Sequence, residues 1–325
     1  MIRAGLVHAC RQKLSGLILI IYNMSATLLM ILCSALNLAA AEPAAVSSTT
    51  TWHVKSSPHF EIYHEADWSP GSISLELERL YGKLRLSVSM FAPWMVKEKT
   101  KIYIYRNQDS YLRGEFKPPK WSKGLAYFFQ KTVVVFDSGD IVKLRAAASH
   151  ELSHLYFESF YGEYLKYPPQ WLNEGLAVLM EDMSYPEEGP WTQALKYFPR
   201  ERVLPLDDFF RIRIDQLGSD EQIGYWYLES FGVVSYLFRP RTRLQFVNFC
   251  SLLRKGEPLE AALWKSYRLS GPAGMERSWR EWIRTYGSKN NQTFSGASSA
   301  DKFSFKPIQF SSFTLTNFNS TRTSR

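Results

Sequence analysis

The spacing of apolar residues predicts strands early in the chain and helices in the remainder. Short runs rich in β-branched and aromatic residues, which are typical of strands, occur at 52–64 (WHVKSSPHFEIYH), 101–105 (KIYIY) and 132–136 (TVVVF). Apolar positions spaced by three and four predict an amphipathic helix between the first two runs, at 70–91. The same spacing predicts further helices at about 140–161, 170–182, 221–238, 241–255, 257–269 and 273–286.

This order of elements predicts an α+β fold in two lobes. Residues 42–165 are expected to form an N-terminal α/β lobe, in which a small mixed sheet precedes the helix at 140–161. Pro168 and Pro169 then interrupt the chain, because proline cannot continue a helix. Residues 166–287 are therefore expected to form a mostly helical C-terminal lobe, with a cleft between the two.

Two segments are predicted to be irregular. Pro118, Pro119 and Gly124 indicate a loop between KIYIY and TVVVF. The tail at 288–325 is rich in Ser, Thr and Asn and is interpreted as disordered and polar.

TVVVF, the last strand before the helix at 140–161, is the candidate for a free sheet edge that binds an extended substrate, with a purely structural strand as the alternative.

Residues 1–41 have the pattern of an export signal. A basic start and an apolar region precede the small residues Ala39 to Ala41, which match a cleavage site. Translation from Met24 would leave a shorter signal. Without cleavage, the two apolar blocks together approach the ~20 residues that span a bilayer and would anchor the protein in a membrane. We expect an exported protein, secreted or periplasmic, with membrane anchoring as the alternative.

Composition and charge limit the classes of partner. The chain has 325 residues, of which 45% are hydrophobic, and this is ample for a large folded core. Its formal net charge is +8, but residues 1–41 and the tail from 288 carry most of the excess of Lys and Arg. The region between them is nearly neutral, so the overall excess of Lys and Arg over Asp and Glu does not indicate a nucleic-acid partner. The sequence does not indicate an oligomeric state.

The sequence HELSH at 150–154 has the residue types and spacing of a metal site. His150 and His154 lie one helical turn apart on the same face, so both imidazoles can bind one cation. Glu151 follows the first histidine, and its carboxylate can reach a water beside the metal. An ordinary amphipathic helix with two histidines is the alternative, and a third ligand is needed to set it aside.

Glu174, in WLNEGLA, is the candidate third ligand. It lies 20 residues after His154, on the helix predicted to follow the proline pair. Two helices joined by a turn at this pair could bring its carboxylate to the two imidazoles. The set would then be His, His and Glu, with one position open for water.

HExxH followed about twenty residues later by NExxA resembles the gluzincin zinc metallopeptidases of the peptidase MA-like, thermolysin-like group. The resemblance covers roughly residues 52–286 and rests mainly on HELSH and WLNEGLA. It implies a zincin-like fold, one Zn²⁺ per chain bound by His150, His154 and Glu174, and Glu151 as general base.

The resemblance also implies a second donor for the oxyanion, taken from a later helix. Tyr227 matches best, followed by Tyr225, and a core tyrosine is the alternative for either. Carboxylates that orient the imidazoles are expected on the two helices of the site, where the candidates are Glu158, Glu181 and Asp182.

Together these features predict an exported zinc metallopeptidase that acts on peptides or proteins. No stretch like GxMEN, which holds the substrate amino terminus in gluzincin aminopeptidases, precedes HELSH, so endo-acting cleavage is favoured. Two alternatives remain. One is a zinc hydrolase of a non-peptide amide or ester, and the other is a binding or scaffold protein on a gluzincin fold with little turnover.

Overall fold

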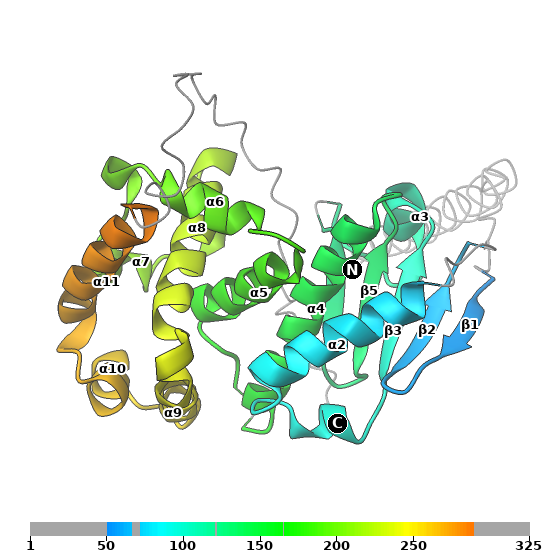
Figure 1. The fold of residues 1–325 in the computed structure, drawn as a ribbon, viewed down its shortest axis with the longest axis horizontal. Helices are drawn as coiled ribbons and strands as arrows, with labels where there is room; N and C mark the ends of the chain where they lie inside the picture. The colour runs from blue at the N-terminus through cyan, green and yellow to red at the C-terminus, as the bar shows by residue number, and fades with distance from the viewer. Residues whose placement is uncertain (1–50, 67–71, 121, 165, 289–325) are drawn as a thin grey trace, which may run out of the picture. The chain divides into compact units, whose positions relative to one another are not determined.

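The computed structural model describes residues 51–66, 72–120, 122–164 and 166–288 (Figure 1). The predicted signal at 1–41, the alternative start at Met24 and the tail beyond 288 lie outside these residues. Among the helices that are described, none combines the length and apolar character that a membrane span requires.

The N-terminal part contains a mixed five-stranded sheet in the order β1-β2-β3-β5-β4 (Figure 1). The strand β2 pairs in parallel with β3, and β3 with β5, whereas the outer pairs β1–β2 and β4–β5 are antiparallel. The strands are β1 (His53–Ser56), β2 (Phe60–His64), β3 (Thr100–Tyr105), β4 (Gly124–Tyr127) and β5 (Thr132–Phe136).

Of the two interpretations of TVVVF, the edge strand is wrong and the purely structural strand is confirmed. TVVVF forms β5, which lies between β3 and β4, so that Val133 pairs with Ile102 on one side and Ala126 on the other. Its three valines are fully buried, as expected for a strand covered on both faces. The outer strands are β1 and β4, and β4 is the one that lies beside β5. It falls in a segment interpreted as a loop, because its sequence GLAY is too short and glycine-led to be recognised as a strand.

Helices cover both faces of the sheet. The long helices α2 (Ile73–Val88) and α4 (Ile141–Gly162) pack on one face, where Val133 and Val135 join the main core. The short helix α3 (Gln108–Arg113) packs on the other, where Val134 joins a smaller aromatic cluster. Asp140 caps α4 by accepting hydrogen bonds from the amides of Val142 and Lys143, so this helix begins where the sequence predicts.

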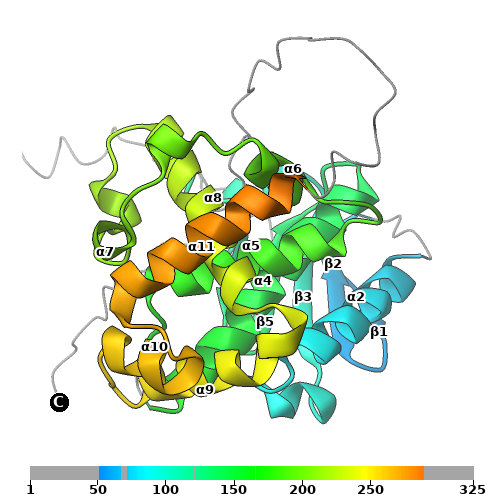
Figure 2. The same cartoon turned by 60° about the vertical axis from the view of Figure 1, so that its left-hand side comes forward.

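The C-terminal part is built from helices. The helix α5 (Gln170–Ser184) packs against α4 on one side and against α8 (Asp220–Leu237) on the other. Figure 2 shows α11 (Gly271–Ser288) lying across this region, where it contacts α6, α7 and α8. The remaining elements are α6 (Pro190–Lys196), α7 (Leu206–Phe209), α9 (Arg243–Arg254), α10 (Leu259–Tyr267) and the 3₁₀ turns Pro93–Val96, Arg200–Arg202, Ile214–Gln216 and Pro240–Thr242.

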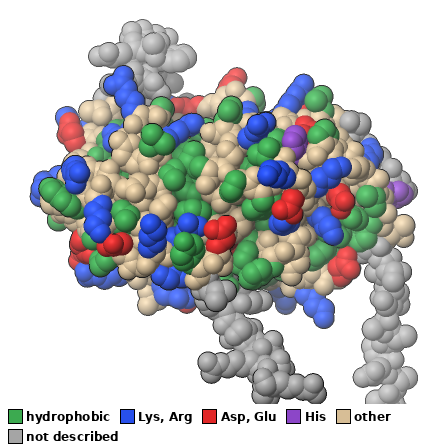
Figure 3. Space-filling view, turned by 90° about the horizontal axis from the view of Figure 1, so that it is seen from below, with side chains coloured by type: hydrophobic (Ala, Val, Ile, Leu, Met, Phe, Trp, Pro, Cys, Tyr) green, Lys and Arg blue, Asp and Glu red, His purple; other side chains and the backbone are tan. Residues whose placement is uncertain are grey.

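One main hydrophobic core runs through both parts, from Phe60 on β2 to Trp279 on α11. The expected α+β architecture, with a small mixed sheet followed by a mostly helical remainder, is confirmed. The division into lobes at 165/166 stays a prediction. On the face in Figure 3, Lys and Arg side chains are interspersed with Asp and Glu side chains.

Candidate metal centre

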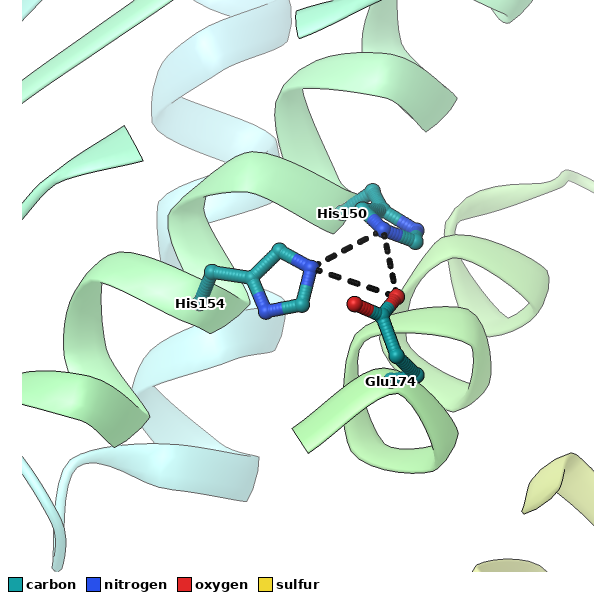
Figure 4. A group of neighbouring side chains, drawn as sticks. All are labelled: His150, His154 and Glu174. Carbon is teal, nitrogen blue, oxygen red and sulfur yellow. Dashed lines mark hydrogen bonds and ion pairs between the residues drawn. The ribbon is translucent and has the colours of Figure 1, made fainter. Parts of the chain in front are cut away.

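His150, His154 and Glu174 meet at the contact between α4 and α5 (Figure 4). The two Nε2 atoms lie 3.1 Å apart. Oε2 of Glu174 lies 3.8 Å from Nε2 of His150 and 3.7 Å from Nε2 of His154. All three side chains are buried, so these three ligand-type atoms converge on one point that is shielded from bulk water.

The spacing of these atoms fits a tetrahedral zinc ion. Zinc bonds of about 2.0–2.2 Å to nitrogen and oxygen place neighbouring ligand atoms about 3.3 Å apart in a tetrahedral site. The distances of 3.1, 3.7 and 3.8 Å bracket this value. Oε2 of Glu174 has no hydrogen-bond partner among the described residues, although it is buried. A cation bound by all three atoms would satisfy it.

A carboxylate orients the first histidine. Nδ1–H of His150 donates to Oε2 of Glu181 on α5 at 2.9 Å, so Nε2 is the ring nitrogen that faces Glu174. Burial lowers the pKa of His150, but the hydrogen bond and charge of Glu181 outweigh burial and raise it to about 9. Burial, followed by the neighbouring charge of His150, lowers the pKa of His154 to about 3.

The other two candidate carboxylates differ in what they contact. Glu158 accepts a hydrogen bond of 2.9 Å from Nδ2 of Asn173, whose side chain also approaches His154 and partly opposes the lowering of its pKa. Nδ1 of His154 itself has no hydrogen bond within the described part of the chain. Asp182 instead accepts from the amides of Trp191 and Thr192 and caps α6, away from the imidazoles. Asn173, directly before Glu174, is a site neighbour that the sequence did not single out.

Glu151 is buried on α4 against the start of the edge strand. A Cβ atom at Gly124 would lie 2.5 Å from Cγ and Oε1 of Glu151, so this carboxylate fits only because residue 124 has no side chain. Burial raises the pKa of Glu151 to about 7, against the opposing effect of a charged His150. Its Oε2 has no hydrogen-bond partner in the described structure.

Of the two candidate tyrosines, Tyr227 lies at the site. It is buried on α8, and its hydroxyl donates a hydrogen bond to the carboxylate of Glu174. Burial and the charge of Glu174 raise the pKa of Tyr227 well above its ordinary value. Tyr225 points elsewhere and stacks on Phe198, with ring centroids 6.0 Å apart. The role of Tyr227 as oxyanion donor stays a prediction.

An HExxH helix packed on a second helix that supplies a glutamate is the arrangement of a metallopeptidase-type hydrolase. Residues 91–285, more than half of the chain, match the peptidase MA superfamily. The protein belongs to this superfamily, which confirms the resemblance at that level, while the thermolysin-like subgroup stays a prediction. A comparison with curated proteins finds no match.

Proposed function

We propose that the protein is an exported, zinc-dependent peptidase that cleaves within polypeptide chains. The observation that carries this proposal is the convergence of two imidazole nitrogens and one carboxylate oxygen, with the carboxylate of Glu151 buried on the same helix as the two histidines. Membership of the peptidase MA superfamily supports peptidase-type chemistry. Export rests on the sequence of residues 1–41, and internal cleavage rests on the absence of a GxMEN-like stretch before HELSH.

His150, His154 and Glu174 would bind one zinc ion, which supplies a Lewis acid that polarises the substrate carbonyl and lowers the pKa of water. The protein holds these three ligands in fixed orientations. Glu181 fixes the ring of His150 through Nδ1, and Tyr227 donates its hydroxyl proton toward Glu174. Each ligand atom therefore faces the common point before substrate binds.

Glu151 is the proposed general base. Its Oε1 lies toward Gly124, and its Oε2, which lacks a partner among the described residues, is the atom that would take a proton from the attacking water. The same oxygen would return this proton to the leaving nitrogen. No covalent intermediate is required, and no Ser or Cys nucleophile is invoked.

The edge strand β4 is the proposed support for the substrate backbone. It begins at Gly124 beside Glu151, and among the described strands only β5 pairs with it. Its outer backbone groups can therefore pair with an extended peptide, which would place a peptide bond close to the catalytic carboxylate.

Two measurements test the proposal on the purified protein. Metal analysis should find one zinc per chain, and His150→Ala or Glu174→Ala should lose it while the circular dichroism spectrum is retained. A peptide-library digest analysed by mass spectrometry should show internal cleavage that is absent in Glu151→Gln. Protein that folds normally without zinc would overturn the metal site. Zinc-dependent cleavage of an amide or ester library alone, or zinc binding without turnover, would assign one of the two alternative functions.

A further inference from the structure

The turn between β4 and β5 carries an exposed aromatic surface. Phe128 and Phe129 lie in this turn, with ring centroids 4.0 Å apart, and Tyr167 lies edge-on to Phe128 at 6.5 Å. We call these three residues the aromatic tip. Phe129 is 75% exposed and Tyr167 is also exposed. Large aromatic side chains grouped on the surface commonly mark a binding site.

The aromatic tip is fixed against the active-site helix. Phe128 lies directly over Gly162, the last residue of α4, where a Cβ atom would be 2.6 Å from Cε2 of Phe128. The turn is closed by a hydrogen bond from the amide of Lys131 to the carbonyl of Phe128. Phe128 is therefore held in position, and the ring of Phe129 lies against it.

The strand β4 joins this tip to the catalytic carboxylate. It starts at Gly124, against Glu151, and ends at Tyr127, directly before the tip. Four strand residues extend about 13 Å. On α4, the eleven residues from Glu151 to Gly162 extend about 16 Å in the same direction. The tip thus lies about 13–16 Å from the reacting carbonyl, along the outer edge of β4.

The direction of pairing decides which part of a substrate reaches the tip. A peptide that adds to β4 in the antiparallel sense, as β5 does on the other side, runs from the tip towards Gly124. Its carbonyl at Glu151 is then preceded by residues that lie along β4. At about 3.3 Å per residue, the fourth or fifth residue before the cleaved bond reaches the tip.

On these grounds, and resting on the peptidase function proposed above, we propose that the aromatic tip is a specificity subsite. It binds one large apolar side chain of the substrate, four or five residues on the amino-terminal side of the cleaved bond. Phe129 supplies the exposed ring face, and Phe128 and Tyr167 support and flank it.

Single-phenylalanine peptides test this subsite. Zinc-loaded protein is incubated with twelve-residue peptides of Ala, Gly and Ser in which one Phe is moved along the chain, and mass spectrometry locates each cleaved bond. The cleaved bond should follow the Phe at a fixed distance of about four or five residues, with kcat/KM roughly tenfold above the peptide without Phe. Phe129→Ser should remove most of this gain. Leu244→Ser, which changes an 83% exposed residue on α9, should keep it.

A binding measurement separates this subsite from the catalytic proposal. In Glu151→Gln, fluorescence anisotropy should show tighter binding of the Phe peptides, and Phe129→Ser added to this variant should weaken it roughly tenfold. Cleavage without a Phe preference, a preference on the carboxyl-terminal side, or an equal preference in Phe129→Ser would overturn the subsite alone. Loss of self-association in Phe129→Ser with unchanged cleavage would overturn it and assign the tip to a dimer contact. Absence of cleavage that depends on Glu151 would overturn the peptidase function and this inference together.

Discussion

Gly124→Ala tests how closely the edge strand approaches the general base. The added methyl would lie 2.5 Å from Oε1 and 2.7 Å from Cδ of Glu151, whereas ordinary contact begins at 3.4 Å. Either the carboxylate or β4 must therefore move by about 0.9 Å. A displacement near 1 Å costs about 100-fold in rate, or about 2.7 kcal/mol in activation free energy. We expect kcat to fall by this factor, because Glu151 leaves its position beside the attacking water.

The variant should retain its metal and most of its stability. The three atoms nearest to the added methyl all belong to Glu151 and not to a proposed ligand, so Gly124→Ala should still bind one zinc per chain. Overpacking in this region should lower the free energy of unfolding by about 1–3 kcal/mol. Gly82→Ala is the matched control, because nothing lies within 4 Å of its Cβ position on α2. It should leave kcat unchanged and raise stability by about 1 kcal/mol.

The assays are kcat on a cleaved peptide, zinc content and thermal melting, measured for the wild type and both variants. Wild-type kcat in a fully folded Gly124→Ala protein would refute the close approach of β4 to Glu151. Loss of zinc together with activity would show that the strand supports the ligands and not the base.

Three further predictions concern groups around the site and in the core. Glu181→Gln should weaken zinc affinity about 10–100-fold by loosening the ring of His150, as measured by competition with a chelator, and unchanged affinity would contradict the role of this bond. Tyr227→Phe should lower kcat roughly 100-fold with zinc retained, whereas loss of zinc at unchanged kcat per bound metal would limit Tyr227 to orienting Glu174. Burial raises the pKa of Glu229 to about 8 from 4.5, so the native state holds this proton more tightly than the unfolded chain and stability falls as pH rises between these values. Glu229→Gln should therefore melt progressively higher than wild type from pH 5 to pH 8, and a constant difference would contradict the shift.

The sequence predicted the features of this protein that depend on local periodicity. Helix α4 could be located because apolar spacing and the cap Asp140 act within a few residues. His150 and His154 share a face of that helix for the same reason. Glu174 could be proposed because the proline pair implies a turn between two helices, and the structure brings the three residues together.

Which of two nearby residues on a helix faces the metal site could be decided only from the structure. Glu181 and Asp182 are about 100 degrees apart around α5, so only one of them can face His150, and helix phase alone did not decide between them. The packing of α5 on α4 turns Glu181 to the imidazole and leaves Asp182 to cap α6. Likewise, Tyr225 and Tyr227 point in different directions from α8, and only Tyr227 contacts Glu174.

The order of the strands could not be predicted, because pairing joins residues that are distant in the sequence. TVVVF has the stronger strand sequence, but this strength reflects burial on both faces, which is incompatible with a free edge. The weaker sequence GLAY is compatible with an edge strand for the opposite reason. Small residues at Gly124 and Ala126 let it lie close to α4, and one side of its backbone stays available for pairing.

The hairpin β4–β5 therefore links the proposed chemistry to the proposed specificity. The buried strand β5 fixes the position of β4 relative to α4, so Gly124 at one end sets the place of Glu151. The turn at the other end sets the place of Phe129. Because both ends belong to one rigid element, the distance between the cleaved bond and the apolar side chain is fixed by strand geometry. A change in the length of β4 would shift that distance while leaving the metal ligands on α4 and α5 in place.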